Sequence, residues 1–353
     1  MILAADVGGT KTNVGFFGMK SGKLVCVAED TYQNENHKDL HEILKLFMEG
    51  ERLCATSACI GVAGPVQDGR CVVTNLPWTV DGRLISESLR IDHVAVLNDL
   101  EATAHSLDYL ADQQVVELFA GDASVGGNRA IIAAGTGLGE SSVFWDGSQY
   151  QPFATEGGHA TFGPRNKLEL ALAEYLIEQY GHASWERVVS GPGLVNIYKF
   201  LLLQNQDRAN TEVSARIEKN GAAAISDAGL SGECEVCEQA VNLFATFYAA
   251  EAGNLALKVL ATGGIYIGGG IATKILPKLQ TPQFFAAFAD KGRMRWLLEK
   301  IPIRVITTNR AAMIGAAACA WHLTTGNANL ATLNKMRLTD SARHEAAKTG
   351  ASV

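Results

Sequence analysis

A glycine turn near the start of the chain separates two apolar stretches. In LAADVGGTKT an apolar run that contains Asp6 comes directly before Gly8 and Gly9. Beyond the turn, apolar residues alternate with small or polar ones over 13–16, and a period of two is that of a β-strand. The pattern predicts strand, turn and strand over residues 1–17. A Rossmann or Walker loop would lead into a helix instead.

Helical and strand patterns alternate along the following residues. Apolar residues at helical spacing predict a helix over 39–50, and the runs ACIGVAGPV and HVAVLND predict buried strands. LEATAHSLDYL then continues as a helix. Strands that alternate with helices predict a mostly parallel α/β sheet. Further helices are predicted at 168–180, 235–260 and 310–324, and the polar chain from about residue 326 predicts a tail with room for one short helix.

The strand, glycine turn and strand pattern recurs in the middle of the chain. RAIIAAGTGLGESSVFW is an apolar strand, a turn from Gly135 to Gly139, and a second strand that ends near Trp145. In GGIYIGGGIATKIL a strand meets the glycines Gly268–Gly270, and a helix follows. Two such units favour a duplicated α/β fold with one hairpin in each half.

Composition and charge narrow the class of protein. A chain of 353 residues predicts two domains, and 47% hydrophobic against 19% charged residues is typical of a globular protein. The net charge is −7 and no long Lys/Arg block occurs, so neither nucleic acid nor an anionic membrane is an expected partner. Backbone dipoles could still bind a nucleotide. We expect neither a signal peptide nor a membrane span, because the sequence lacks a basic segment leading into an apolar run and any stretch of about 18 apolar residues.

The seven cysteines are odd in number and scattered, which predicts reduced thiols in the cytoplasm. Cys234 and Cys237 form one CxxC pair, but a zinc site needs about four ligands. No second CxxC or His pair lies nearby in the sequence. Ordinary helix positions are therefore favoured over a metal or redox site for these two residues.

The first glycine turn has the composition of a phosphate-binding loop. Glycine tolerates positive φ and has no Cβ, so adjacent glycines let backbone N–H groups approach an anion closely. Thr10 adds a hydroxyl donor, and Lys11 adds positive charge. Asp6 cannot bind phosphate itself, but it could act through Mg²⁺, directly or through water. A plain hairpin that needs glycines is the alternative, and the recurrence of glycine turns weakens it.

Polar residues near strand ends are candidates for sugar chemistry. Asn98 and Asp99 end the run HVAVLND, at the sheet edge where open α/β folds bind ligands. Asp99 could accept a proton from a hydroxyl nucleophile, or it could be only the N-cap of the following helix. Glu156 and His159 could bind adjacent sugar hydroxyls, with a zinc site or a polar loop as alternatives. Glu186 precedes another glycine-rich segment and is a weaker candidate.

A series of motifs spans nearly the whole chain in a recognisable order. ADVGGT, GVAGPV, TNLPW, NDLEATA, GTGLG, EGGH, ERVVSGPGLVN and GGIYIGGGI together resemble the bacterial glucokinase family, within the actin-like sugar kinases. The resemblance runs from about Leu3 to about His322. It implies a duplicated ribonuclease-H-like fold of the actin-like ATPase type, with two domains and a cleft between them. The related ROK sugar kinases and repressors carry a zinc-binding cysteine cluster that this sequence lacks after His159.

The resemblance also implies roles for individual residues. It places the phosphate-binding turn on Asp6, Gly8, Gly9 and Thr10, the second nucleotide turn on Gly135, Thr136 and Gly137, and the adenosine-side glycines on Gly268, Gly269 and Gly270. It places sugar contacts on Asn98, Asp99, Glu156, His159 and Glu186, with Asp99 as catalytic base, and loops that close the sugar pocket on Gly64, Pro65 and Asn75. Many relatives have glycine in place of Ala5 and asparagine in place of Lys11, so the first turn is more cationic here.

Together these features predict an ATP-dependent glucokinase that forms glucose 6-phosphate. The expected ligands are glucose, ATP and Mg²⁺, and the expected protein is a cytoplasmic homodimer. A small domain is expected at 1–109 plus 308–328, a large domain at 110–307 and a polar tail at 329–353, with both substrates in the cleft between the domains. The alternatives are a kinase for another hexose, a sugar-sensing regulator and an actin-like ATPase. The regulator would need a DNA-binding segment, and the ATPase would need no sugar-binding residues.

Overall fold

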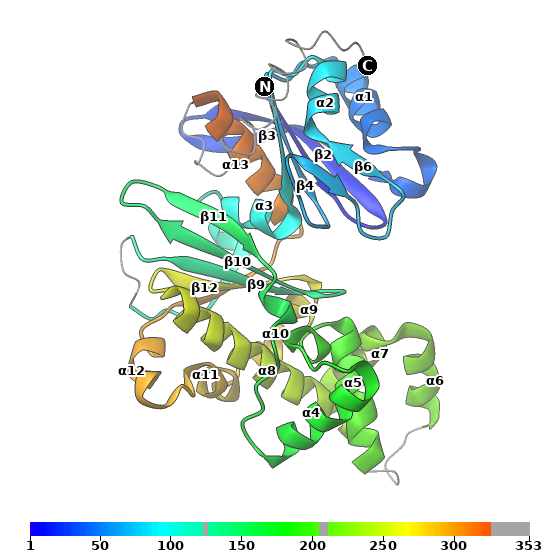
Figure 1. Cartoon of the computed structure of the whole chain (residues 1–353), viewed down its shortest axis with the longest axis vertical. Coiled ribbons are helices and arrows are strands. Elements are labelled where there is room, and N and C mark those ends of the chain that lie inside the picture. The colour runs from blue at the N-terminus through cyan, green and yellow to red at the C-terminus, as the bar shows by residue number, and fades with distance from the viewer. Residues whose placement is uncertain (123–125, 205–210, 326–353) are drawn as a thin grey trace. The chain divides into compact units, whose positions relative to one another are not determined.

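The computed structural model describes residues 1–122, 126–204 and 211–325, which form two compact units (Figure 1). Of the described residues, the first unit contains 1–111 and 310–325, and the second contains those between 112 and 309. The expected tail at 329–353, with its short helix, lies outside the described residues.

The first unit is built on a five-stranded mixed sheet. In sheet order its strands are β3 (Lys23–Gln33), β2 (Lys11–Lys20), β1 (Ile2–Val7), β4 (Ser57–Val62) and β7 (His93–Asn98). β1, β2 and β3 are antiparallel neighbours, whereas β4 and β7 run parallel to β1. Its other elements are α1 (Leu40–Glu51), α2 (Gly82–Leu89), α3 (Asp99–His105), α13 (Ala311–Thr325) and a small sheet of β5 (Arg70–Val72) and β6 (Thr79–Asp81).

The alternation of side chains along β1 divides its residues between the two faces of this sheet. The odd-numbered apolar residues from Leu3 join the core that α1 covers with Ile43 and its helical neighbours. Ile2 and Ala4 lie on the opposite face, where the small residues of α13 pack close to β1 and β4, beside α3 (Figure 1). Because Asp6 has the same parity as Ile2 and Ala4, it lies on the α3 and α13 face.

The second unit repeats this arrangement. In sheet order its strands are β11 (Tyr150–Thr155), β10 (Leu138–Trp145), β9 (Arg129–Ala134), β12 (Gly264–Gly268), β13 (Ile303–Ile306) and β8 (Val115–Phe119). β9, β10 and β11 are antiparallel neighbours, and β12 and β13 run parallel to β9. The first five strands thus have the order and directions found in the first unit, with β8 added antiparallel to β13. The α/β class and the two strand, turn and strand predictions are confirmed. The expectation of a mostly parallel sheet is wrong, because each glycine turn leads back into an antiparallel strand.

Helices make up most of the rest of the second unit. They are α4 (Lys167–Tyr180), α5 (Gly191–Gln204), α6 (Thr211–Asn220), α7 (Ala222–Ser231), α8 (Glu235–Val259), α9 (Gly270–Lys274), α10 (Leu276–Leu279), α11 (Pro282–Ala289) and α12 (Arg295–Leu298). The helices predicted at 168–180, 235–260 and 310–324 are α4, α8 and α13. α8 packs against β9 and β12 and carries much of the core. In the described part of the chain, no helix combines the length and the apolar character needed to cross a membrane.

The CxxC pair has a structural position. Cys234 is the N-cap of α8, and its sulfur accepts a hydrogen bond from the Cys237 backbone N–H (3.3 Å). Both thiols are buried, and all seven cysteines of the chain are free. Among the residues that the structure describes, no group of three or more His, Cys, Asp or Glu side chains is placed to hold a metal ion.

Candidate active site

Asp6 lies near the end of β1, on the face that α3 covers. It is half-buried, and the Asn13 side-chain amide on the neighbouring strand donates a hydrogen bond to its carboxylate (3.3 Å). The Thr31 hydroxyl on β3 in turn donates to the Asn13 side-chain oxygen (3.0 Å). Burial, together with the nearby Asp99 carboxylate, raises the pKa of Asp6 to about 6. Two carboxylates therefore share one polar region of the first unit.

The β1–β2 turn (residues 8–10) follows Asp6 directly. The Gly8 N–H donates to the Lys11 carbonyl oxygen (3.0 Å), which closes a tight hairpin. The Gly9 and Thr10 N–H groups and the Thr10 hydroxyl have no acceptor among the described residues, and both residues are exposed. Neither glycine has a positive φ, so that part of the argument for glycine is wrong. Gly9 instead leaves open space, since an added Cβ there would have its nearest contact at 3.9 Å.

Asp99 is the first residue of α3, and Asn98 is the N-cap. The Asn98 side-chain oxygen accepts the Leu100 N–H (3.0 Å), and the Asp99 carboxylate accepts the same N–H (2.8 Å). The interpretation of Asp99 as the N-cap is therefore wrong, because the preceding residue occupies that position. Burial raises the pKa of Asp99 above its ordinary value, against the opposing effect of the Leu100 hydrogen bond. A carboxylate that is more basic than usual is better suited to accept a proton.

Gly61 shapes the surroundings of Asp6 and Asp99, although the sequence analysis did not predict it. It pairs with Asp6 across β1 and β4, and a Cβ added to it would lie 3.1 Å from the Ala102 Cβ and 3.8 Å from the Asp99 Cα. Its lack of a side chain lets the start of α3 lie directly on β4. A glycine inside a buried strand is the available signal, since it often marks the close approach of another backbone.

The loop residues expected to close a sugar pocket lie in the same unit. The Asn98 side-chain amide donates to the Gly64 carbonyl oxygen (3.1 Å), which ties this loop to the start of α3. Asn75 has a positive φ of 67° and is the residue nearest to the open side of Gly9. Pro65 is exposed beside Gly64. The first unit thus brings Gly64, Asn75 and Asp99 to the surroundings of one turn.

The β9–β10 turn (residues 135–137) is the counterpart in the second unit. The Gly135 N–H donates to the Gly137 carbonyl oxygen (2.8 Å), and the Gly135 carbonyl accepts the Gly191 N–H at the start of α5 (2.8 Å). Thr136 at its tip is exposed. The Glu186 carboxylate accepts the Leu138 N–H (3.0 Å) and lies against Gly137. Glu186, expected to contact sugar, therefore also contacts this turn.

Glu156 is the N-cap and His159 the last residue of a single turn of 3-10 helix, η3 (Gly157–His159), which follows β11. Their side chains are 78% and 62% exposed, and the Glu156 carboxylate lies 4.0 Å from the His159 Nε2, so both remain available to a ligand. A Cβ on Gly158 would overlap the Leu138 carbonyl, which explains the second glycine of EGGH.

Backbone hydrogen bonds join this turn to the segment of Glu186. The Trp185 N–H donates to the Ala160 carbonyl (3.0 Å), and the Phe162 N–H donates to the Ala183 carbonyl (2.9 Å). The Trp185 and Phe162 rings also pack edge to face. Glu156, His159 and Glu186 therefore belong to one connected region around Leu138.

A buried carboxyl pair lies beneath η3. Glu140 on β10 is 3% exposed, lies against Gly157, and is close enough to the fully buried Glu251 of α8 to be affected by its charge. Glu251 also contacts the Lys258 ammonium (2.9 Å) and accepts from the Asn254 amide (2.7 Å). Burial, and next the charge of Glu251, raise the pKa of Glu140 to about 8, against the opposing effect of Lys258.

The glycines Gly268–Gly270 lie at the end of β12. Gly269 has a positive φ of 85°, and an added Cβ there would overlap the Ala134 carbonyl, so glycine is required. The buried Tyr248 hydroxyl of α8 accepts the Ala134 N–H (2.9 Å) and lies 2.8 Å from the Gly268 carbonyl oxygen. One tyrosine thus fixes the strand ends that precede both glycine segments of this unit. Tyr248 looks like a core aromatic in the sequence and was not predicted.

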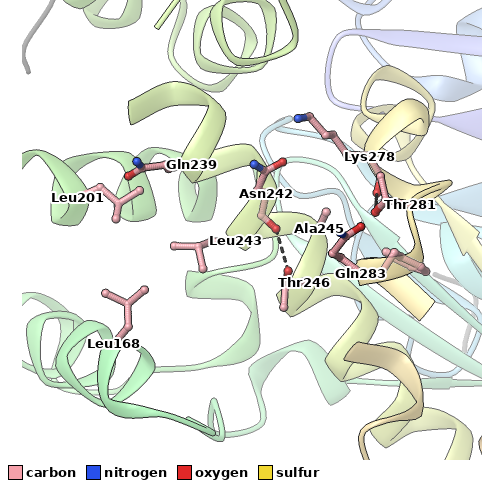
Figure 2. A pocket seen from close by; sticks show the side chains of 11 residues that line it. Leu168, Leu201, Gln239, Asn242, Leu243, Ala245, Thr246, Lys278, Thr281 and Gln283 are labelled. Atoms are coloured by element: carbon pink, nitrogen blue, oxygen red, sulfur yellow. Dashed lines mark hydrogen bonds between the residues drawn. The ribbon is translucent and has the colours of Figure 1, made fainter. Parts of the chain in front are cut away.

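A separate hollow in the second unit has a volume of about 580 Å³. Figure 2 shows it among α4, α5, α8, α10 and α11, and none of the expected site residues lines it. Its polar groups are bonded locally: the Thr246 hydroxyl donates to the Asn242 carbonyl (2.9 Å, dashed in Figure 2), and Lys278 pairs with Glu238 (2.9 Å). It lacks the convergent polar groups that a sugar needs.

Comparison with known proteins supplies the remaining evidence. The family model described as Glucokinase matches residues 3–323. A glucokinase of Nostoc sp. (strain PCC 7120) is 39% identical over 340 residues, which cover 92% of this chain and 99% of that protein. The crystal structure of a glucokinase from an Antarctic psychrotroph has a TM-score of 0.83 at 30% identity, covering 91% of this chain and 98% of that one.

A more distant structure shares the fold. The ROK family glucokinase from Streptomyces griseus, solved in complex with glucose and AMPPNP, has a TM-score of 0.57 at 20% identity. The match covers 91% of this chain and 99% of that chain. At this identity the likeness shows the fold alone.

Proposed function

Since the chain belongs to the glucokinase family, we propose that it transfers the terminal phosphoryl group of ATP to the primary hydroxyl of glucose. The relatives' names supply the reaction, and the glucose and AMPPNP bound to the Streptomyces griseus structure support the two substrates. The seven free thiols support a reducing compartment such as the cytoplasm. The family resemblance supports a homodimer.

The position of Asp99 carries the mechanism. It is the first residue of α3, its pKa is raised by burial, and the separate N-cap Asn98 frees it from a purely structural role. We assign it as the base that accepts the proton of the attacking hydroxyl. In phosphoryl transfer most of the acceleration comes from positioning and charge stabilisation, with the base completing the proton transfer.

The β1–β2 turn would receive the phosphates. Its free donors are the Gly9 and Thr10 N–H groups and the Thr10 hydroxyl, and exposed Lys11 adds charge. Donors held in place before the reaction stabilise the charge that develops on the transferred group. The β9–β10 turn (Gly135, Thr136, Gly137) and the glycines Gly268, Gly269 and Gly270 would complete the nucleotide site.

The carboxylates beside this turn fit a divalent cation. Asp6 and Asp99 lie close enough for the charge of Asp99 to raise the pKa of Asp6, and a cation would offset that repulsion. Oxygen ligands suit Mg²⁺, and Asp6 would hold it through water. When bound, Mg²⁺ would neutralise phosphate charge.

Glucose would bind to residues of both units. Glu156 and Glu186 supply exposed and half-buried carboxylate acceptors, and His159 supplies its two ring nitrogens. Asn98 comes directly before Asp99, the proposed base. Gly64, Pro65 and Asn75 would cover the sugar. The reaction requires Asp99 and these acceptors to act on one glucose molecule, so we propose a shared cleft between the units. Holding both substrates in line can supply roughly 7–11 kcal/mol of the rate acceleration.

A coupled assay with ATP, Mg²⁺ and a panel of hexoses tests this function. We expect the highest kcat/KM for glucose over mannose, galactose and fructose. Preference for another hexose would change the substrate but keep the reaction class. Absence of phosphorylation of every hexose by a folded preparation would overturn the proposal.

A further inference from the structure

A buried asparagine outside every sequence motif contacts the β1–β2 turn. Asn34 begins the 3-10 helix η1 (Asn34–Asn36), directly after β3. It is only 2% exposed, which is unusual for an asparagine in the connection between two elements. Buried polar side chains normally have their hydrogen bonds made. Those of Asn34 are made to the turn and to its flank.

Three hydrogen bonds join Asn34 to this region. Its side-chain Nδ2 donates to the Gly8 carbonyl oxygen (2.9 Å), and its backbone N–H donates to the Thr10 carbonyl oxygen (2.9 Å). Its Oδ1 accepts the hydroxyl of the fully buried Thr12 (2.8 Å), which fixes the direction of the amide. The two carbonyls lie on either side of Gly9. The turn therefore cannot rotate without breaking a bond to Asn34.

The bond to Gly8 also sets the direction of the next N–H group. In a trans peptide the carbonyl and the following N–H point in opposite directions, and the described part of the chain contains no cis peptide. Because the Gly8 carbonyl points at Asn34, the Gly9 N–H points away from it. That N–H is one of the donors with no acceptor among the described residues. Asn34 thus orients a free donor that it does not itself contact.

We propose that Asn34 is a positioning residue for phosphoryl transfer, which holds the Gly8–Gly9 peptide so that the Gly9 N–H faces a nucleotide phosphate. The inference rests on the proposed function, which places ATP at this turn. Glycine imposes few limits on φ and ψ, so the two glycines do not hold this orientation by themselves. Asn34 supplies the restraint that the glycines lack.

Asn34→Asp is the most direct test. The aspartate keeps the size of the side chain and an acceptor for the Thr12 hydroxyl, but it places an oxygen opposite the Gly8 carbonyl where Nδ2 was. Repulsion between the two oxygens should release the peptide. We expect the KM for ATP to rise about tenfold, within the range for loss of a buried hydrogen bond. The KM for glucose should stay within about twofold, since no sugar-binding group is changed.

Variants of Thr12 and of the core provide controls. Thr12→Val keeps the buried shape but removes the hydroxyl that orients the amide, so the KM for ATP should rise by less than in Asn34→Asp. Thr12→Ser keeps the hydroxyl, so its KM for ATP should equal that of the wild type. Ile43→Val deletes a methyl group from the core that α1 covers, without contact to the turn. It should lower the thermal midpoint and leave both KM values unchanged.

Calorimetric titration of ATP without sugar, on the full chain, separates this inference from the proposed function. Weaker ATP binding by Asn34→Asp at unchanged glucose affinity supports the inference. Equal ATP affinity in the folded variant and the wild type overturns it. If Asn34→Asp does not fold, the comparison of Thr12→Val with Thr12→Ser decides by the same criterion. A wild type that binds ATP but phosphorylates no hexose overturns the proposed function instead.

Discussion

The two glycine turns occupy the same place in two similar sheets, yet their surroundings differ. Beside the β1–β2 turn, Gly9 is exposed, and the nearest atom to an added Cβ would be 3.9 Å away. Beside the β9–β10 turn, a Cβ on Gly137 would lie 2.5 Å from a carboxylate oxygen of Glu186. The first turn has open space on one side, and the second has that space filled by an acidic side chain.

The hydrogen bonds that other residues make to each turn also differ. Asn34 binds the carbonyls of the first turn and leaves the N–H groups of Gly9 and Thr10 free. The first N–H of each turn, that of Gly8 or Gly135, is used within the turn, but only beside the second turn does a carboxylate, that of Glu186, accept the N–H that follows, from Leu138. One sheet topology therefore supports a turn held by a buried amide and a turn coupled to an acidic side chain. In the proposed function the first turn would receive phosphate, and the second would lie between the nucleotide and the sugar.

The largest effect should come from Asp99, which stands beside the open turn. Asp99→Asn keeps the shape and can still accept the Leu100 N–H through its oxygen, but it cannot take a proton at neutral pH. A general base typically contributes 10²–10⁴-fold, so we expect kcat to fall by about that range with a modest change in glucose Kd. The measurement is kcat by coupled assay, beside glucose Kd and the thermal midpoint.

The exposed Asp92 provides a matched control for this test. Asp92→Asn makes the same chemical change near the same strand and should leave kcat unchanged. A folded Asp99→Asn enzyme that retains more than about a tenth of wild-type kcat would remove Asp99 from the role of base.

The acceptors beside the second turn should give the next largest effect. Glu156→Gln replaces one acceptor oxygen with a donor, so a sugar hydroxyl would lose its partner at a cost of about 1–3 kcal/mol. Glucose affinity measured by calorimetry should then weaken about 5- to 150-fold. Glu174→Gln, on an exposed part of α4, is the control and should bind glucose as the wild type does. Unchanged affinity in Glu156→Gln would exclude Glu156 from the sugar site.

Much of this comparison could be predicted from the sequence, because it depends on local patterns. Strands interrupted by glycine turns have a clear period, and Asp6 and Asp99 stand at recognisable strand ends. The helices α4, α8 and α13 also have strong apolar patterns. By contrast, the antiparallel share of the sheets was underestimated, because each predicted hairpin is extended by a third antiparallel strand, β3 or β11, that was not predicted.

The residues that hold the turns could not be predicted in this way. Asn34 lies in the polar stretch QNENHKD and looks like any loop residue, and its partners Gly8 and Thr12 lie far back in the sequence. Tyr248 resembles any core aromatic of a helix, and its hydroxyl reaches two distant strand ends. Such roles arise only when the chain folds, because they depend on contacts across the sheet.

The same substitution at the two turns should give opposite results. Gly137→Ala would push the Glu186 carboxylate from the Leu138 N–H, so the KM for glucose should rise by about tenfold while the KM for ATP rises less. Gly9→Ala has room for its Cβ, so the KM for glucose should be unchanged and the KM for ATP should rise a few-fold. Neither glycine has a positive φ, so alanine does not strain the backbone. Equal effects on both substrates at both turns would remove the distinction between them.

The last effect concerns Glu140, the buried carboxyl beneath η3, and it appears in the stability of the fold. The pKa of Glu140 is raised from 4.5 to about 8 by burial and then by Glu251, so the folded state prefers its protonated form. Its contribution to stability is fully present below about pH 4.5 and is lost as the pH rises towards 8. Glutamine imitates the protonated acid at every pH. Glu140→Gln should therefore come close to the wild type in thermal midpoint at pH 5 and exceed it at pH 8.5 by at least about 2–4 °C, the shift that roughly 1 kcal/mol produces in a unit of this size.

A pH series of thermal midpoints checks this expectation against a matched variant. Glu178→Gln makes the same replacement at an exposed position of α4 and should run parallel to the wild type across the series. Asp6 and Asp99, the neighbouring carboxylates of the first unit, are only half-buried, unlike Glu140 and Glu251 of the second unit. If the difference between Glu140→Gln and the wild type stays constant from pH 5 to pH 8.5, Glu140 does not carry a proton in the folded protein. The contrast between a half-buried carboxylate pair in the first unit and a buried pair with a protonated Glu140 beneath η3 would then be wrong.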